Sequence, residues 1–194
     1  HRVDRRQRQM CIRDSTYTAP TGTDNCPGAT TIRTTGLASG SAFSVGVTTN
    51  TFRVTDAVGN SATCSFTVTV NDSQLPSITC PSNVSLPNTL NLCSRIVAYS
   101  APIGSDNCPG ASTLRITGLA SGSAFPVGVT TNTFRVTDAA GNTATCAFTV
   151  TITDTQIPTI ACPSNISLAN TLNLCSRDVT YSTPVGSDNC PGAN

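Results

Sequence analysis

The chain has 194 residues, of which 11% are charged, against about 25% in a typical domain. It contains no Lys and no Glu, and its one His is residue 1, so the usual bases that activate a Ser or Cys nucleophile are missing. It also has no basic-aromatic surface for nucleic acid and no apolar run long enough to span a membrane. We therefore expect no enzyme activity, no catalytic or cofactor-binding residues, no nucleic-acid partner and no membrane span in this segment.

Residues 1–15 differ in character from the rest of the chain. They hold five Arg and two Asp, and they alone make the formal net charge of +1 positive. The stretch from Arg5 to Ser15 resembles the in-frame translation of a common sequencing adapter over all eleven positions. We therefore interpret residues 1–15 as a non-native, adapter-derived segment and exclude them from fold reasoning. One observation points the other way, because Cys11 lies in phase with a repeat cysteine and could pair with Cys26.

The rest of the chain is a tandem repeat with a regular period. The motif Asp-Asn-Cys-Pro-Gly-Ala occurs three times, with its cysteines equally spaced at Cys26, Cys108 and Cys190. When residues 16–97 are aligned with residues 98–179, 62 of the 82 positions are identical. We expect three domains, namely a first repeat that lacks its N-terminal strand (16–72), a complete repeat (73–153) and the N-terminal part of a third repeat (154–194).

Alternating polar and apolar residues predict strands in the complete repeat. From Thr143 to Ile152 the alternation is strict, with Cys146, Phe148 and Val150 on the same face as Ile152. Other predicted elements are strands at Thr133–Thr137, Ser77–Leu86, Arg95–Ser100 and Thr113–Thr117, and a turn at Asp138–Asn142. In the second strand of the repeat we expect Val97 and Tyr99 to face inward.

The composition and the spacing of these segments indicate the fold class. Thr, Val, Ser, Gly, Pro and Asn dominate, which favours strands and turns over helices. Six or seven short strands in about 80 residues, separated by turns, are typical of an immunoglobulin-like sandwich. We therefore predict an all-β chain of tandem immunoglobulin-like β-sandwich domains, one complete and two truncated.

The repeat resembles the hyalin repeat (HYR) domain over essentially all of residues 16–194. The matching residues are Cys80-Pro-Ser-Asn, Asp106-Asn-Cys, Ser123-Ala-Phe-Pro-Val-Gly128, Thr133-Phe-Arg-Val-Thr-Asp-Ala-Ala-Gly-Asn142 and Ala144-Thr-Cys-Ala-Phe-Thr-Val150. The resemblance implies an extracellular module associated with cell adhesion, found in tandem arrays. It supplies no catalytic residues to carry over.

Ten cysteines without a CxxC pair predict disulfides, and hence a secreted or cell-surface location. The four cysteines of the complete repeat allow three pairings. Cys80 and Cys146 both point inward, and the first and last strands of a sandwich can run side by side, which favours Cys80–Cys146. Cys93–Cys108 then follows, and Cys175–Cys190 is its counterpart in the third repeat. The resemblance agrees, since simpler HYR domains keep only the outer pair.

Calcium is the one ligand that the pattern suggests, although no firm metal site is predicted. In a sandwich of this kind Asp72, Asp106 with Asn107, and Asp138 with Asn142 would fall at one pole. Asp and Asn are also good turn formers, which is the alternative explanation of their positions.

We weigh three functions for this chain. The first is a spacer or adhesive segment of a large surface or secreted protein, with neighbouring repeats of the same chain as its partners. The second is a module that binds a cell-surface protein or glycan through pole loops such as Gly118–Phe125, with calcium as a possible stiffener. The third is a tether for an enzyme domain elsewhere. The sequence Gly-Leu-Ala-Ser-Gly-Ser-Ala-Phe recurs unchanged at Gly36 and Gly118, which favours the spacer. Exposed edge strands leave the oligomeric state open.

Overall fold

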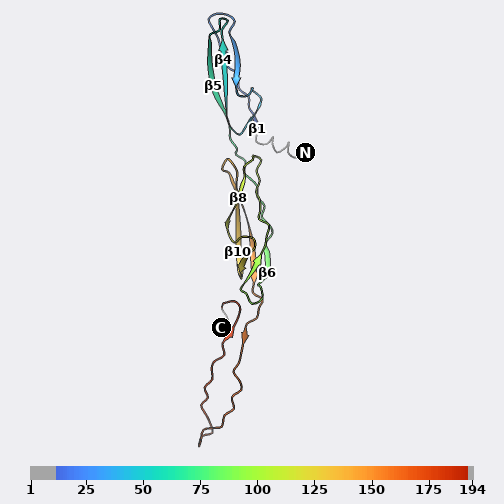
Figure 1. The fold of residues 1–194 in the computed structure, drawn as a ribbon, viewed down its shortest axis with the longest axis vertical. Helices are drawn as coiled ribbons and strands as arrows, with labels where there is room; N and C mark the ends of the chain where they lie inside the picture. Colours follow the sequence, from blue (N-terminus) through green and yellow to red (C-terminus); the bar gives the residue numbers. More distant parts are fainter. Residues whose placement is uncertain (1–11, 192–194) are drawn as a thin grey trace. The chain divides into compact units, whose positions relative to one another are not determined.

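A computed structural model describes residues 12–191 of the chain (Figure 1). Every regular element within residues 12–191 is a β-strand, which confirms the predicted all-β class, and the described strands of the first and complete repeats form two sheets each, as expected for a sandwich. Accordingly, the described part of the chain contains no helix that could cross a membrane.

The first repeat contains five strands in two sheets. β2, β4 and β5 form a three-stranded antiparallel sheet, and β1 pairs with β3 in a second sheet. The bounds are β1 Ile12–Asp14, β2 Thr30–Thr35, β3 Ala42–Ser44, β4 Gly46–Thr55 and β5 Ser61–Val70. β1 lies inside residues 1–15, the predicted non-native segment, and it pairs with β3 as the corresponding strands β7 and β9 of the complete repeat do. The excluded Cys11 lies outside the described residues, and Cys26 is free.

The complete repeat has six strands. The sheet order is β6-β11-β10-β8, and β7 pairs with β9 in a second sheet. The bounds are β6 Val84–Pro87, β7 Ser94–Val97, β8 Ser112–Thr117, β9 Ser123–Pro126, β10 Gly128–Thr137 and β11 Thr143–Thr153. As predicted, the first strand of the sheet runs alongside the last one, with Val84 opposite Val150 in a parallel ladder.

The inward face predicted for the last strand is the core of the complete repeat. Phe148, Val150 and Ile152 are at most 2% exposed, because alternate residues of β11 face the same side of the sheet. Tyr99 packs edge-on against Phe148, with 5.0 Å between ring centroids. Val97 is buried and Tyr99 is half-buried, which confirms the predicted inward face of this strand.

Two predicted strands are longer than the observed ones, and one observed strand lies in a predicted loop. Ser77–Leu86 shrinks to β6 at Val84–Pro87, with a single bridge from Ser77 to Ser105, because Pro81 has no N–H to donate to a ladder. Arg95–Ser100 ends at Val97 because the Tyr99 N–H donates to the Ser121 side chain instead of a neighbouring strand. β9 falls in the predicted loop Gly118–Phe125, where Gly122 precedes the strand and Pro126 ends it, yet its Phe125 is fully buried.

The third repeat contains only the short pair β12 (Thr159–Ile160) and β13 (Gly186–Ser187) within the described residues. All residues from 157 to 183 are exposed, and Tyr181 is 67% exposed. In the complete repeat the counterpart Tyr99 packs on β10 and β11, and no strands equivalent to these two are present in the described part of the third repeat.

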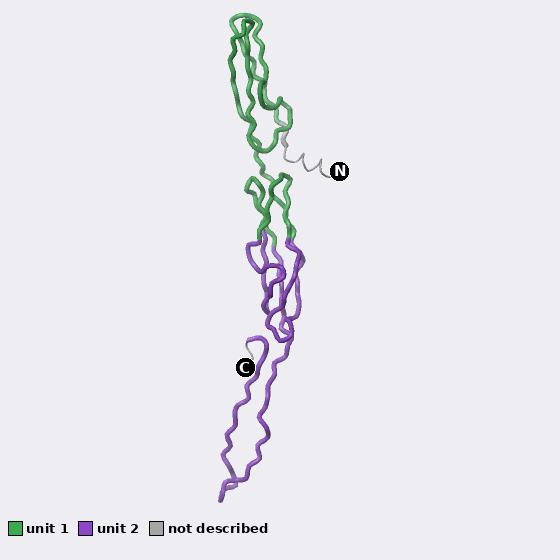
Figure 2. The backbone as a smooth tube through the Cα atoms, in the orientation of Figure 1, with its two compact units in different colours: residues 1–79, 102–114, 135–146 green, residues 80–101, 115–134, 147–194 purple. Residues whose placement is uncertain are grey.

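Contacts divide the chain into two compact units (Figure 2). Unit 1 comprises residues 1–79, 102–114 and 135–146, and unit 2 comprises residues 80–101, 115–134 and 147–194. Unit 1 therefore contains the first repeat with Asp72 and Asp106, whereas unit 2 contains the third repeat and the β7–β9 sheet of the complete repeat.

Candidate functional site

The loop from Gly118 to Phe125, here the Gly118 loop, is the predicted binding loop, and the structure shows that side chains behind it hold its backbone. The Tyr99 hydroxyl donates to the Leu119 carbonyl at 2.6 Å, and the Leu119 N–H donates to Asn132 Oδ1 at 2.8 Å. The Ser121 hydroxyl donates to the Tyr99 carbonyl at 2.7 Å. The loop is therefore anchored at three points within its own sandwich, twice to Tyr99 and once to Asn132 of β10.

The same three anchors recur in the first repeat. Tyr17 donates to the Leu37 carbonyl at 2.6 Å, the Leu37 N–H donates to Asn50 at 2.7 Å, and Ser39 donates to the Tyr17 carbonyl at 2.7 Å. The loops at Gly36 and Gly118 thus have the same sequence and also the same internal contacts.

Asn132 is a functional residue that the sequence reasoning missed. It is fully buried, and a Cβ placed at Gly118, whose φ is +87°, would lie 2.1 Å from its Oδ1 atom. Gly118 is therefore required both for the turn and for this close approach. A signal was available, because Asn132 alternates with Phe134 and Val136 on the inward face of β10.

Two of the predicted calcium candidates lie together in unit 1. A carboxylate oxygen of Asp72, one of Asp106 and the sulfur of Cys108 lie within 4.8 Å of one another. The group recurs one period later with Asp154, Asp188 and Cys190, which are in unit 2.

The donor set of these two groups limits the ions that they suit. Cys108 and Cys190 are both disulfide-bonded, so neither offers a thiolate to a metal. Each group therefore supplies two carboxylates, which suit a hard cation such as Ca²⁺ but fall short of its six to eight oxygen ligands.

The third candidate, Asp138, is not part of either group and serves its own turn. It is 6% exposed and accepts hydrogen bonds from the Ala140 N–H and from the N–H and side chain of Asn142. Burial alone would raise the pKa of Asp138, but these hydrogen bonds outweigh it and hold the pKa below its usual value. The Asn142 amide also donates to the Asp72 and Gln74 carbonyls, at 3.3 and 3.2 Å.

The disulfides correct two of the three predicted pairings. Cys93 is bonded to Cys190, with 4.9 Å between Cα atoms, so the predictions Cys93–Cys108 and Cys175–Cys190 are wrong. Cys175 is free and exposed. Cys80 and Cys146 are each disulfide-bonded, as the predicted Cys80–Cys146 pairing requires.

The physical reason for the correction is the position of Cys93 in unit 2. Cys93 ends the loop Asn88–Cys93, here the Asn88 loop, which lies against the start of the third repeat. The Asn88 amide donates to Asp154 Oδ1 at 2.9 Å, and Asn189, next to Cys190, donates to the Leu92 carbonyl at 3.1 Å. These contacts bring Cys190 to Cys93.

Further hydrogen bonds complete this junction between the complete and third repeats. Thr155 donates from both its N–H and its hydroxyl to Asn88 Oδ1, each at 3.3 Å. The Asn91 N–H donates to the Gln156 side chain at 2.8 Å, and Gln156 donates back to the Asn91 side chain at 3.3 Å. The junction is thus built largely from amide side chains that no sequence motif had singled out.

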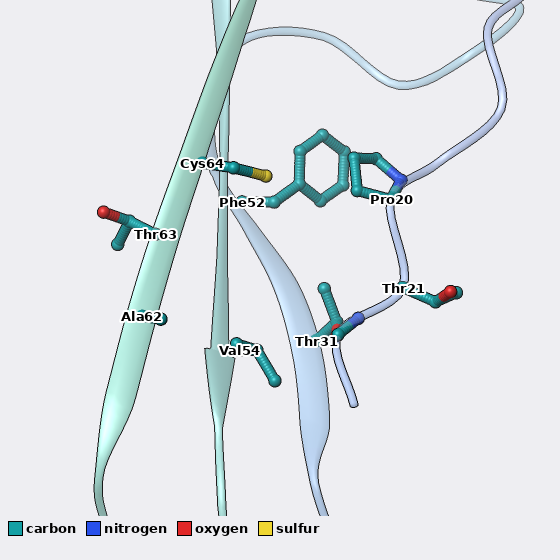
Figure 3. Close-up of a pocket in the computed structure, with 9 residues that line it drawn as sticks. Pro20, Thr21, Thr31, Phe52, Val54, Ala62, Thr63 and Cys64 are labelled. Carbon is teal, nitrogen blue, oxygen red and sulfur yellow. The ribbon is translucent and has the colours of Figure 1, made fainter. Parts of the chain in front are cut away.

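A pocket of about 220 Å³ opens in the first repeat beside Phe52 (Figure 3). Its lining consists of Pro20, Thr21, Gly22, Thr31, Phe52, Val54, Ala62, Thr63 and Cys64. Cys64 is the only ionisable group among these residues, so the lining offers no base to activate its thiol. The pocket therefore has the chemistry of exposed core and not that of an active site.

Comparison with known proteins agrees with this fold and repeat organisation. The family profile of the HYR domain matches residues 12–70 and 71–152, which is most of the chain. The chain belongs to the HYR family. As an HYR array it is an adhesion-related extracellular repeat module.

Two hyalins are similar to this HYR chain. It is 37% identical over 177 residues to hyalin of Strongylocentrotus purpuratus and 36% identical over 177 residues to hyalin of Lytechinus variegatus. Each alignment covers 89% of this chain, but only 15% and 33% of those proteins, so the chain spans a minor part of its curated relatives.

Solved structures of cadherin ectodomains show a much weaker similarity. Drosophila N-cadherin EC1-3 gives a TM-score of 0.28 at 12% identity, covering 68% of this chain and 57% of that one. PcdhgB3 EC1-4 gives 0.32 at 15% identity, covering 71% and 42%.

Proposed function

We propose that this HYR array is the non-catalytic spacer within an adhesive segment of a larger secreted or cell-surface protein. Its disulfides suit an oxidising extracellular location. Its first and complete repeats carry the same anchored loop one period apart, as expected of an array that sets the distance between other parts of the protein. Its direct partners, on this proposal, are the neighbouring repeats.

The observation that carries this proposal is the anchored Gly118 loop. A loop that recognises a partner needs side chains that are free to differ between repeats and to meet a ligand. Here Tyr99, Ser121 and Asn132 hold the backbone from within, and Tyr17, Ser39 and Asn50 do the same one period earlier. The contacts of this loop therefore stabilise the sandwich.

The experiment places the chain between a bead and a known adhesive peptide. We expect the chain alone to capture no more cells than an unrelated β-sandwich, whereas inserting it under the peptide raises capture by lifting the peptide from the bead surface. Ala120→Arg, at an exposed position of the Gly118 loop, should leave capture unchanged.

The alternative is a module that binds a protein or glycan through these loops. Capture by the chain alone, lost in Ala120→Arg and in its counterpart Ala38→Arg, would reject the spacer and establish this second function. The third function, a tether for an enzyme domain, requires that the larger protein has enzyme activity. The array would then act as a spacer for that enzyme domain.

A second proposal is that Ca²⁺ stiffens the array at the paired aspartates. The supporting observation is that the group of Asp72 and Asp106 recurs at Asp154 and Asp188 with the same spacing. We expect Ca²⁺ to raise the Tm of the full chain over its value in chelator, and Asp72→Asn with Asp106→Asn to reduce that shift. Asp178→Asn, at an exposed aspartate outside both groups, is the control. An unchanged Tm of the wild-type chain rejects calcium.

A further inference from the structure

The loop from Asn170 to Cys175 in the third repeat, here the Asn170 loop, has the same internal structure as the Asn88 loop. The Asn170 amide donates to the Leu174 carbonyl at 2.6 Å, as Asn88 does to Leu92 at 3.1 Å. In each loop a Leu N–H donates to a Thr carbonyl, from Leu174 to Thr171 and from Leu92 to Thr89. An Arg side chain also donates to a backbone carbonyl, from Arg177 to Ala169 and from Arg95 to Pro87. Finally, Asn173 and Asn91 both have positive φ angles, of 66° and 61°.

The two loops differ in what lies against them. The Asn88 loop holds the start of the next repeat, through Asp154, Gln156 and the Asn189–Cys190 pair. The Asn170 loop is exposed at every residue, and beside it lies a groove of about 340 Å³. Its apolar lining, Ile166, Leu168 and Val179, matches Val84, Leu86 and the buried Val97 of the complete repeat, so the groove is the uncovered inner face of the third repeat and is not part of the docking site. The two loops therefore share the same internal contacts, although residues lie against only one of them.

The pattern of free cysteines points to the missing partner. Cys175 is not bonded to Cys190, although Cys190 follows it closely in the sequence, because Cys190 is bonded to Cys93 in the preceding repeat. The separation from Cys93 to Cys190 is 97 residues. Applied to Cys175, the same separation falls beyond residue 194, and Cys175 is free.

The other free cysteines obey the same rule. Cys26, which corresponds to Cys108 and Cys190, would need a partner 97 residues earlier, before residue 1. Cys64 and Cys162 correspond to Cys146 and Cys80, and the separation between Cys80 and Cys146 also puts their partners outside the chain. Cys108, at the position of Cys190, is bonded, although not to Cys93.

We propose that the Asn170 loop is a preformed docking site for a following HYR repeat, and that Cys175 bonds to the cysteine 97 residues further on, the separation seen for Cys93 and Cys190. By this rule each repeat of an array is joined to the next by a disulfide that crosses the junction. The recognition elements are those seen at the occupied junction, namely an Asp-x-Gln segment and an Asp-Asn-Cys segment of the following repeat.

Each cross-link is an ordinary oxidation of two thiols. Two S–H bonds break and one S–S bond forms, with the loss of two protons and two electrons. The electrons pass by thiol–disulfide exchange to a disulfide oxidant, such as oxidised glutathione, which leaves as two thiols. Docking places the two sulfurs together before this exchange.

The first test maps the disulfides of the full chain with Cys93→Ser and Cys175→Ser, which change the same position in consecutive repeats. Free thiols are alkylated and the chain is cut after Arg, so that residues 178–194 form a peptide with Cys190 as its only cysteine. We expect Cys93→Ser to release this peptide in alkylated form and Cys175→Ser to leave it disulfide-linked. Release in Cys175→Ser, or retention in Cys93→Ser, would overturn the proposal.

The second test asks whether the rule recurs. The chain is lengthened after Asn194 by a further copy of residues 113–194, which supplies a cysteine at the same separation of 97 residues after Cys175. We expect Cys175, alkylated in the original chain, to be bonded to that cysteine, with Cys93–Cys190 unchanged. Cys175 that stays free, or that bonds within its own repeat, would contradict a docking role. Neither outcome depends on whether the array acts as a spacer.

Discussion

At the scale of single residues, a few amide side chains do much of the positioning in this chain. Asn132 accepts the Leu119 N–H from a fully buried position, and Asn88 contacts Asp154 and Thr155 across a repeat junction. A buried amide that accepts a backbone N–H spares that group the cost of an unmade hydrogen bond, about 1–3 kcal/mol. Asn at these positions therefore fixes the backbone where no strand partner is available.

Asp138 gives a prediction at this scale, because its turn is present twice. Asn142→Ala removes the side-chain donor to Asp138, so the pKa of Asp138 should rise toward its usual value of 3.8. The lowered pKa of the folded protein adds stability that is present above the pKa of the unfolded chain and is lost as pH falls through the folded value. Asn142→Ala should therefore lose less stability on acidification than the wild type.

The measurement is an NMR titration of the aspartate carboxyl carbons. The control is Asn60→Ala, because Asn60 is the largest cause of the lowered pKa of Asp56 in the first repeat. Each variant should shift only its own aspartate. An unchanged Asp138 titration in Asn142→Ala would show that the backbone donors alone hold the carboxylate.

At the scale of elements, β5 and β11 show how a neighbouring strand changes burial. They have nearly the same sequence, and both stack a Phe on the preceding strand, with ring centroids 6.3 and 6.4 Å apart. Phe148 is 2% exposed where β6 pairs with β11, whereas Phe66 is half-buried and β5 has no strand on that side among the described residues. Because both side chains are Phe, the difference in their burial follows from the pairing of β11 with β6.

This difference predicts unequal costs for the same substitution. Phe148→Ala should lower the free energy of unfolding of its sandwich by about 3–5 kcal/mol, the range for a fully buried Phe. Phe66→Ala should cost clearly less, because part of the ring already contacts water. Hydrogen exchange measured peptide by peptide resolves the two repeats. Equal losses in both would mean that β6 adds nothing to the core.

The elements that could be predicted from sequence are those with a local signal. Strict alternation predicts β11, and the Asp138–Asn142 turn predicts its hairpin with β10. β9 could not be recognised because the stretch between Gly122 and Pro126 is too short to show a period. The predicted pairing of Cys93 with Cys108 follows from assigning Cys80 to Cys146 and pairing the cysteines within one repeat, whereas the junction contacts that decide the partner of Cys93 form between repeats.

At the scale of the whole molecule, the Cys93–Cys190 bond gives the backbone a second covalent connection across the junction. By loop-closure entropy, a bond that closes a loop of about 100 residues stabilises the folded chain by roughly 4.7 kcal/mol. The bond also keeps the complete and third repeats attached when the linker between them is cut.

A protease site inserted at Ile157, which is 80% exposed, tests this attachment. After cleavage the wild-type chain should run as one species without reductant and as two with it. Cys93→Ser should separate without reductant, while Cys175→Ser behaves as the wild type. Separation of the oxidised wild-type chain would show that no disulfide crosses the linker.

The spacing of the bonds has a mechanical consequence for an array built by the proposed rule. The shortest covalent route across such a repeat runs back along the short segment between the positions of Cys190 and Cys175 and then through a disulfide. Fully extended, a segment of about 15 residues reaches about 50 Å, against about 280 Å for a whole period of about 82 residues. Pulling on the array could then unfold its sandwiches without lengthening it much. The array would therefore resist extension until a reductant broke the disulfides and allowed the rest of each repeat to extend.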